Sequence, residues 1–178
     1  MNARQALGGL TGRVPGPLYR FVRGLVPIAC VDLLPYRQTQ AGTEIGLILR
    51  HDYRSTEVWC FIGGGIHRGE SVAAAADRHL HETLGADVSQ AGGGLDLPVA
   101  VGEYLPVRFS DEPHDPRKHA IALTYLVELD GIPRPQGEAL AFEWFAADAV
   151  PTERMGFGQD RVYASLRAQP SVAEALSG

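Results

Sequence analysis

The chain has 178 residues, enough for one domain with a full hydrophobic core but cramped for two. Its formal net charge of −5 argues against binding an extended nucleic-acid backbone, whereas a small phosphorylated ligand needs only a few local cations. No apolar run approaches the roughly 20 residues of a membrane span, and the N-terminus lacks the apolar core of a secretory signal. We therefore expect a cytoplasmic protein that acts on a small molecule and not on a membrane.

Residues 1–25 contain several glycines and prolines and are expected to form an N-terminal arm, in which Leu18 to Leu25 can fold as a short amphipathic helix. Such an arm is suited to packing on a partner subunit, so a homodimer is an arrangement to test. The domain proper is expected to run from residue 26 to residue 178. Its two cysteines, Cys30 and Cys60, lie in apolar runs and are expected to be buried and reduced, because their number and spacing suit neither disulfides nor zinc.

Apolar runs predict a series of strands along the domain. The expected strands are Val26–Leu34, Glu44–Arg50, Val58–Ile62, Val99–Leu105, His119–Leu129 and Ala141–Phe145. The first two should form a hairpin, and the run from 119 to 129 is expected to be central, while 87–98 is rich in glycine and is expected to be a loop. With one helix between strands and a second helix at 160–167, this order predicts an α+β fold.

The stretch from Gly63 to Ala86 joins a glycine turn to the central helix. The helix is expected to begin at Ser71, a good N-cap residue, and to end at Gly85. Its apolar face is expected to comprise Ala73, Ala76, Leu80 and Leu84. His79, Glu82 and Thr83 should share another surface, because residues three and four apart are neighbours on a helix. An imidazole and a carboxylate beside a glycine loop can hold a metal and a phosphate, although a solvent-facing amphipathic helix explains the same pattern.

The spacing within this stretch identifies a family resemblance. Gly64 is followed after five residues by Glu70 and after seven more by Arg78, and then come His79, Leu80, His81, Glu82, Thr83, Leu84 and Gly85. This resembles the box of the Nudix hydrolases, in which Gly, five residues, Glu and seven residues precede Arg-Glu, an aliphatic residue, any residue, Glu-Glu, any residue and Gly. The resemblance covers roughly residues 26–167. It implies a Nudix-like α/β/α sandwich with a mixed β-sheet.

Two positions of this box depart from the family. His79 and Thr83 stand where the family has glutamates that hold Mg²⁺ or Mn²⁺, so Glu82 alone remains of three carboxylates. One Nudix branch, similar to GDP-mannose mannosyl hydrolase, uses a helix Glu, an early-strand Asp and a glycine carbonyl instead. By that resemblance the metal ligands here would be Glu82, Asp32 and the carbonyl of Gly63 or Gly64, of which we take Gly64, and His79 is a candidate substitute ligand. Asp32 is alternatively a water-facing residue at a sheet edge, and His79 a general base or a polar surface residue.

The same resemblance suggests further roles. Glu82, Glu138, His79 and Arg78 are the candidate catalytic residues, with Glu138 as general base or extra ligand and Arg78 as the residue that orients carboxylates. Glu138 is otherwise an exposed loop residue. Arg117, Lys118 and His119, at the start of the longest strand-like run, are candidate phosphate contacts or else a solvated basic turn.

Two functions therefore remain open. The first is metal-assisted hydrolysis of a nucleoside diphosphate linked to another moiety, for which a nucleotide-sugar is one candidate. The second is a catalytically impaired Nudix-fold module that binds a nucleotide or regulates another process. The retained Glu70, Arg78 and Glu82 favour the first, and His79 and Thr83 favour the second.

Overall fold

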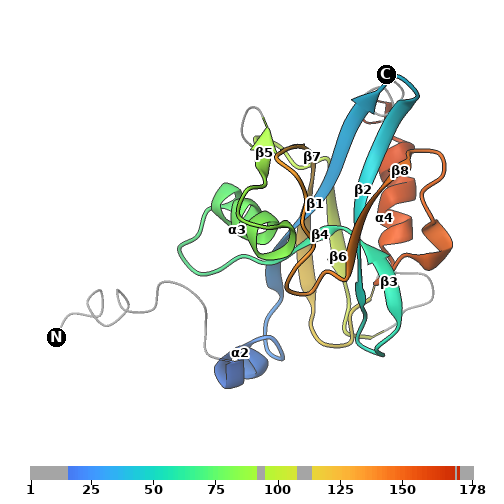
Figure 1. Ribbon diagram of the computed structural model, residues 1–178. Coiled ribbons are helices and arrows are strands. Elements are labelled where there is room, and N and C mark those ends of the chain that lie inside the picture. The colour runs from blue at the N-terminus through green and yellow to red at the C-terminus, as the bar shows by residue number, and fades with distance from the viewer. Residues whose placement is uncertain (1–15, 92–94, 108–113, 171, 173–178) are drawn as a thin grey trace.

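The computed structural model describes residues 16–91, 95–107, 114–170 and 172. In chain order its elements are α2 (Gly16–Val22), β1 (Ile28–Thr39), β2 (Gly42–His51), β3 (Glu57–Cys60), β4 (Ile62–Gly65), α3 (Val72–Leu84), β5 (Ser89–Ala91), β6 (Ala100–Tyr104), β7 (Ala120–Asp130), β8 (Ala141–Ala146), the 3₁₀ turn η1 (Thr152–Arg154) and α4 (Gln159–Arg167) (Figure 1). Among these residues, no helix combines the length and the apolar character that crossing a membrane would require.

A mixed sheet is built around β1 and β7. These two strands pair in parallel from Ile28 and Ala120 onwards. Along its other edge β1 pairs antiparallel first with β4 and then with β2, which confirms the predicted hairpin. β7 also pairs with β6 and β5, so the run that was expected to be central is central.

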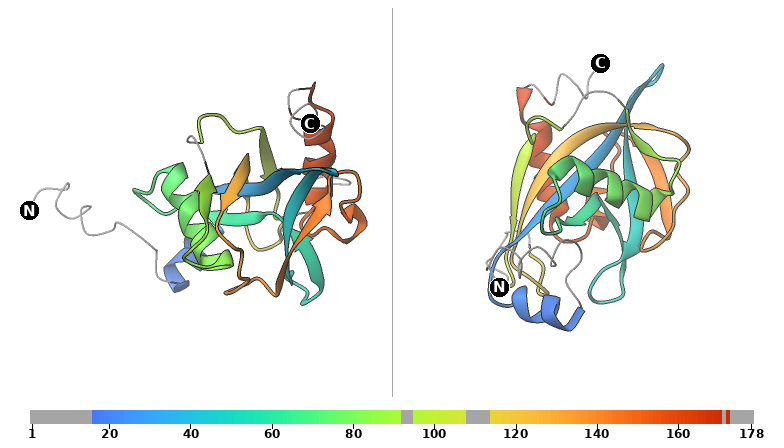
Figure 2. Two further views of the ribbon diagram at one scale, coloured as in Figure 1. Left: turned by 45° about the horizontal axis from the view of Figure 1, so that its top comes forward. Right: turned by 90° about the vertical axis from the view of Figure 1, so that its left-hand side faces the viewer.

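The sheet lies between two helices, α3 on one face and α4 on the other (Figures 1 and 2). Side chains alternate along β1, so Val31 and Leu33 pack with α3 whereas Cys30 and Leu34 belong to the core beneath α4. The predicted α+β sandwich with a mixed sheet is therefore confirmed. Both cysteines are buried and free, as expected.

Some local predictions need correction. In α3, Ala75 is buried in place of Ala73, which is half-buried, whereas Ala76, Leu80 and Leu84 are buried as expected. The expected strand 58–62 is two strands, because the chain changes partner from β2 to β1 at Phe61. The amide of Phe61 leaves the ladder and donates to Oε1 of Gln159 at 2.8 Å.

Within the expected loop at 87–98, residues Ser89–Ala91 form β5. They do so because the end of β7 extends past β6 and offers them a pairing edge, with Ser89 opposite Asp130. The predicted helix of the N-terminal arm is present as α2, but it begins at Gly16 and ends at Val22, and no residue in it is buried.

Candidate functional site

A cleft of about 950 Å³ lies beside β4, the loop after it and the C-terminal half of α3. It is lined by β4 and α3, by α2, by the end of β2 and by the loops that precede β7 and β8. Among the described residues, its charged lining comprises the cations Arg23, Arg50, Arg68, Arg78, Arg117 and Lys118 and the carboxylates Glu82 and Glu138. Six cations and two carboxylates thus line one cleft of a chain whose net charge is −5, and Glu70 and Asp115, outside this lining, pair with two of the six. The cleft is therefore suited to an anionic ligand.

The glycines of β4 allow its backbone to approach both neighbours closely. Gly63 lies opposite Asp32 in the ladder, and a Cβ on it would collide with the carbonyl of Val31. A Cβ on Gly64 would lie 2.8 Å from Cε1 of His79. The sequence indicated a glycine turn here, but Gly63–Gly65 belong to strand β4, and their missing side chains let α3 pack closely against the sheet.

Arg78 fastens α3 to the loop before it. Its Nε and Nη2 donate to the two carboxylate oxygens of Glu70 at 2.7 and 2.8 Å, and Nη2 also donates to the carbonyl of Gly65 at 2.9 Å. These hydrogen bonds, with one from the amide of His67, hold the pKa of Glu70 at about 2 although burial opposes the shift. Nη1 of Arg78 lies 3.3 Å from Glu82, so the same guanidinium orients the candidate catalytic carboxylate.

The three helix residues expected to share a surface all line the cleft, but to different extents. The side chain of Glu82 is 59% exposed, whereas Thr83 is only 3% exposed. Nε2 of His79 lies 3.3 Å from the carbonyl of Gly65. Burial and the charge of Arg78 lower the pKa of His79, which favours the neutral imidazole.

Glu138 also lines the cleft, from the loop before β8, and the amide of Gln136 in this loop donates to the carbonyl of Thr83 in α3 at 2.9 Å. Its Oε1 pairs with Nη1 of Arg50 at 2.6 Å. Sequence reasoning missed Arg50, and its signal was an arginine at the end of an otherwise apolar strand. The ion pair joins the loop before β8 to β2, two segments that lie far apart in the sequence.

The three basic candidates before β7 are not equivalent. Arg117 and Lys118 line the cleft, whereas His119 is not among its lining residues and places Nε2 2.9 Å from Glu103. Arg117 donates from Nε and Nη2 to the two oxygens of Asp115, both at 2.8 Å. Burial would raise the pKa of Asp115, but these bonds lower it.

Asp32 lies in a second, smaller cavity of about 70 Å³. This cavity adjoins the cleft, because Arg50, Arg117 and Lys118 line both. Tyr104 donates to Oδ2 of Asp32 at 3.1 Å, and burial raises the pKa of Asp32 to about 6.

Asp32 thus lines the small cavity and Glu82 the adjoining cleft, and the two share Arg50, Gly63, Gly64, Arg117 and Lys118 in their linings. Across the described ranges, no group of three or more His, Cys, Asp or Glu side chains is placed to hold a metal ion. The four-ligand set of Glu82, Asp32, Gly64 and His79 stays a prediction.

Comparisons with known proteins agree with this fold. A family model described as "Domain of unknown function (DUF4916)" matches residues 17–165. No curated protein sequence matches the chain. A Jonesia denitrificans structure, described as a possible asymmetric diadenosine tetraphosphate hydrolase, is 28% identical with a TM-score of 0.71, covering 86% of this chain and 99% of that one.

Two further structures support the fold alone. The MutT Nudix hydrolase of Burkholderia pseudomallei is 22% identical with a TM-score of 0.59, covering 79% of this chain and 97% of its own. The Nudix domain of Shewanella oneidensis NrtR, solved in complex with ADP-ribose, is 15% identical with a TM-score of 0.60, covering 94% and 97%. Since the family model spans most of its length, the chain belongs to the DUF4916 family, and it has the fold of the Nudix hydrolases.

Proposed function

We propose that the protein hydrolyses a nucleoside diphosphate linked to another moiety, such as a nucleotide-sugar, in the cleft between β4, α3 and the loop before β8. The observation that carries this proposal is that, among the described residues, six cations and the two carboxylates Glu82 and Glu138 line one cleft of about 950 Å³. Cations of this number neutralise a diphosphate, and the volume accommodates a ligand of nucleotide size.

The chain's own residues divide the work between binding and proton transfer. Arg117 and Lys118 bind the phosphate groups, and Arg78 holds Glu82 towards the cleft. Arg50 holds Glu138 by an ion pair to Oε1, and the other carboxylate oxygen accepts a proton from the attacking water. His79 lies neutral against the Gly65 carbonyl and supports the β4–α3 junction.

A divalent metal, Mg²⁺ or Mn²⁺, fits this donor set only if substrate phosphates complete its coordination. Mg²⁺ commonly binds through one or two carboxylates together with substrate phosphates, and Glu82 and Glu138 are the carboxylates that line the cleft. When bound, such an ion would neutralise phosphate charge and help to activate water. This expectation differs from a closed cage that includes Asp32.

The relatives support the substrate class. The Jonesia denitrificans structure bears a diadenosine tetraphosphate hydrolase description, and the NrtR domain was solved with ADP-ribose. Both ligands contain a chain of phosphates between two larger groups. Transfer of that class to this chain is part of the proposal.

A second function is favoured by one observation on α3. Neither Thr83 nor His79 carries a carboxylate. Thr83 is buried, and His79 contacts a backbone carbonyl. A protein that binds the same ligands without hydrolysing them would need the cations but not those carboxylates.

Turnover of a panel that includes ADP-ribose, diadenosine tetraphosphate and GDP-mannose, with Mg²⁺, Mn²⁺ or chelator, tests the two functions. Hydrolysis is expected with metal and should fall at least about a hundredfold in Glu82→Gln and Glu138→Gln. Glu103→Gln, which alters an exposed carboxylate paired with His119 outside the cleft, is the matched control. Tight binding of a panel member without any turnover would contradict hydrolysis and favour the second function, ligand binding alone.

A further inference from the structure

Phe157 lies in the small cavity next to the cleft, and its ring contacts two arginines that line the cleft. The guanidinium carbon of Arg50 is 5.7 Å from the centroid of the Phe157 ring, and that of Arg117 is 5.1 Å from the same centroid. Both distances fall within the range of cation–π attraction. Phe157 lines the small cavity, whereas both arginines line the small cavity and the cleft. The ring therefore contacts the two guanidinium groups from the small cavity.

The backbone of Phe157 is fixed in an unusual conformation. Its φ is +60°, in the left-handed region that residues with side chains rarely adopt. The turn that carries it is tied to β3, because the amide of Gly156 donates to the carbonyl of Trp59 at 2.9 Å. On the other side Gln159 donates its amide to Gly156 and accepts from the amide of Phe61. Such over-determined strain is concentrated at functional sites.

Each arginine has its own carboxylate but keeps a free donor. Arg50 uses Nη1 for Glu138, and Arg117 uses Nε and Nη2 for Asp115. Within the described part of the chain, those pairings leave Nη2 of Arg50 and Nη1 of Arg117 for a ligand. Nε of Arg50 is buried with no hydrogen-bond partner among the same residues, so the ring and Glu138 are what hold this side chain.

We propose that Arg50 and Arg117, held on the ring of Phe157, form a phosphate-binding subsite of the cleft, and that Phe157 is its positioning residue. Each guanidinium is already paired with one carboxylate, and the two groups lie around the same ring. A phosphate group that accepts a hydrogen bond from Nη2 of Arg50 and from Nη1 of Arg117 uses the donors that those two ion pairs leave. The subsite therefore binds one phosphate of the diphosphate derivative, on the side of the cleft that includes Glu138.

This inference deepens the proposed function and rests on it, but it is tested without turnover. Inorganic pyrophosphate and ADP are titrated calorimetrically into the whole protein in EDTA, so that no metal-dependent hydrolysis occurs. Phe157→Leu keeps an apolar side chain but removes the π face, and we expect about tenfold weaker binding of both ligands. Phe157→Tyr keeps the π face and is expected to bind within about threefold of the parent.

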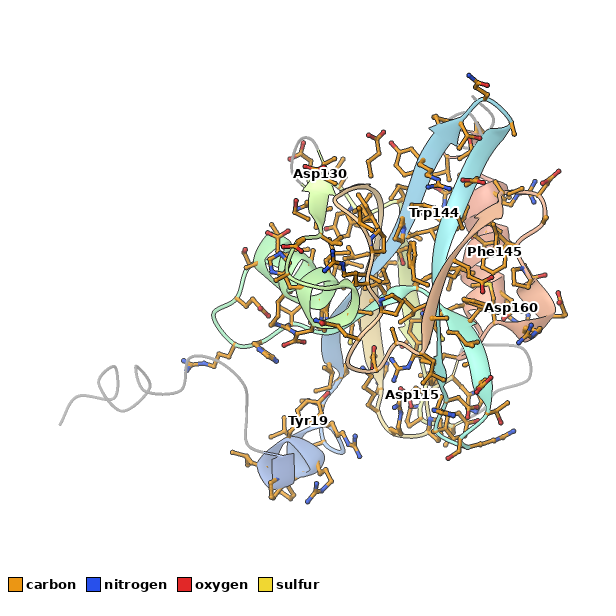
Figure 3. All side chains as sticks on the ribbon, in the orientation of Figure 1. Tyr19, Asp115, Asp130, Trp144, Phe145 and Asp160 are labelled. Carbon is orange, nitrogen blue, oxygen red and sulfur yellow. The ribbon has the colours of Figure 1, made fainter. Side chains whose placement is uncertain are left out.

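Arginine variants provide the second arm. Arg50→Gln and Arg117→Gln are each expected to weaken pyrophosphate binding at least about tenfold. Arg37→Gln is the matched control, because Arg37 lies 4.4 Å over the ring of Trp144 and pairs with Glu44, outside the cleft. Figure 3 shows Trp144 well away from Asp115, the partner of Arg117.

Unchanged pyrophosphate binding in folded Phe157→Leu, or an equal loss in the Leu and Tyr variants, would overturn the positioning role. If Phe157→Leu does not fold, the arginine variants decide, and parent-like binding in both of them would overturn the subsite. A third outcome is that the parent protein binds pyrophosphate through these residues and turns over no substrate. That result would contradict the proposed hydrolysis but not the proposed subsite.

Discussion

Arg78 and Glu70, eight residues apart, form a two-point ion pair that joins the first turns of α3 to the loop before it, with N–O distances of 2.7 and 2.8 Å. The same arginine reaches the Gly65 carbonyl and the Glu82 carboxylate. One guanidinium therefore connects strand, loop and helix on the helix side of the cleft. Gly65, Glu70 and Arg78 therefore have a structural role at the cleft that does not require a bound metal.

Removing the charge of Glu70 should destabilise the protein. In Glu70→Gln the buried side of Arg78 loses its ionic partner, so we expect the free energy of unfolding to fall by about 1–3 kcal/mol at pH 7. Urea unfolding followed by circular dichroism measures the difference. Glu103→Gln, an exposed carboxylate, should change it by less than about 0.5 kcal/mol, and equal effects of the two substitutions would contradict the role of the ion pair.

The contribution of Glu70 should depend on pH in a defined direction. Its pKa is about 2 in the folded protein and near 4.5 when unfolded, so the charged form is bound more favourably in the native state. The stability difference between the parent and Glu70→Gln should be complete above about pH 5 and decline as the pH falls from about 4.5 towards 2. A difference that stays constant from pH 7 down to pH 3 would contradict this assignment.

Asp32 should have the opposite dependence. Burial raises its pKa from 3.8 to about 6, so its contribution is complete below about pH 4 and is lost as the pH rises through 6. Asp32→Asn keeps an oxygen that can accept from Tyr104 but cannot ionise. Relative to the parent, this variant should therefore gain about 2–3 kcal/mol between pH 4 and pH 8, measured by urea unfolding at each pH. No relative gain would show that the buried carboxyl remains ionised without cost.

The contact between Gly64 and His79 gives a double-mutant test. A Cβ on Gly64 would lie 2.8 Å from the imidazole, so Gly64→Ala should cost about 1–3 kcal/mol of stability. Because the clash is with the ring, His79→Ala should restore part of that loss. Thermal unfolding of both single variants and of the double variant measures the coupling. Strictly additive effects would mean that the imidazole is not what limits residue 64.

The sequence predicted those parts of the site that lie close together along the chain. Glu70, Arg78, Glu82 and Gly85 fall within one strand–loop–helix unit, and their spacing alone places them. Ser71 caps α3 through a hydrogen bond from the amide of Ala74, and Gly85 ends it, both as local rules predict. These contacts can be predicted from the sequence because both partners lie close together along the chain.

Relationships set by strand register were not predictable in the same way. Arg50 meets Glu138 because β2 pairs with β8, with Leu49 opposite Ala141, a contact between segments some ninety residues apart. Phe157 reaches the same arginine only because its turn is hydrogen-bonded to β3. Phe157 stands between two glycines in the sequence, and nothing local indicates which cations its ring contacts.

The alternation along β1 shows the same limit for Asp32. A carboxylate in an apolar strand indicated a special environment, and the burial of Asp32 confirms that it does not face water at an edge. The face to which it points is decided by the register of β1 against β4 and β7. That register places Asp32 in the small cavity, whereas Glu82 lines the cleft.

The most direct test of the central claim is phosphorus NMR of ADP-ribose and GDP-mannose incubated with the protein and Mg²⁺ or Mn²⁺. The proposal predicts that the diphosphate resonances of at least one ligand convert to those of hydrolysis products, and that Glu82→Gln and Glu138→Gln stop the conversion. Spectra that remain unchanged with parent protein, although the same ligands bind in the cleft, would contradict hydrolysis and leave a ligand-binding Nudix fold.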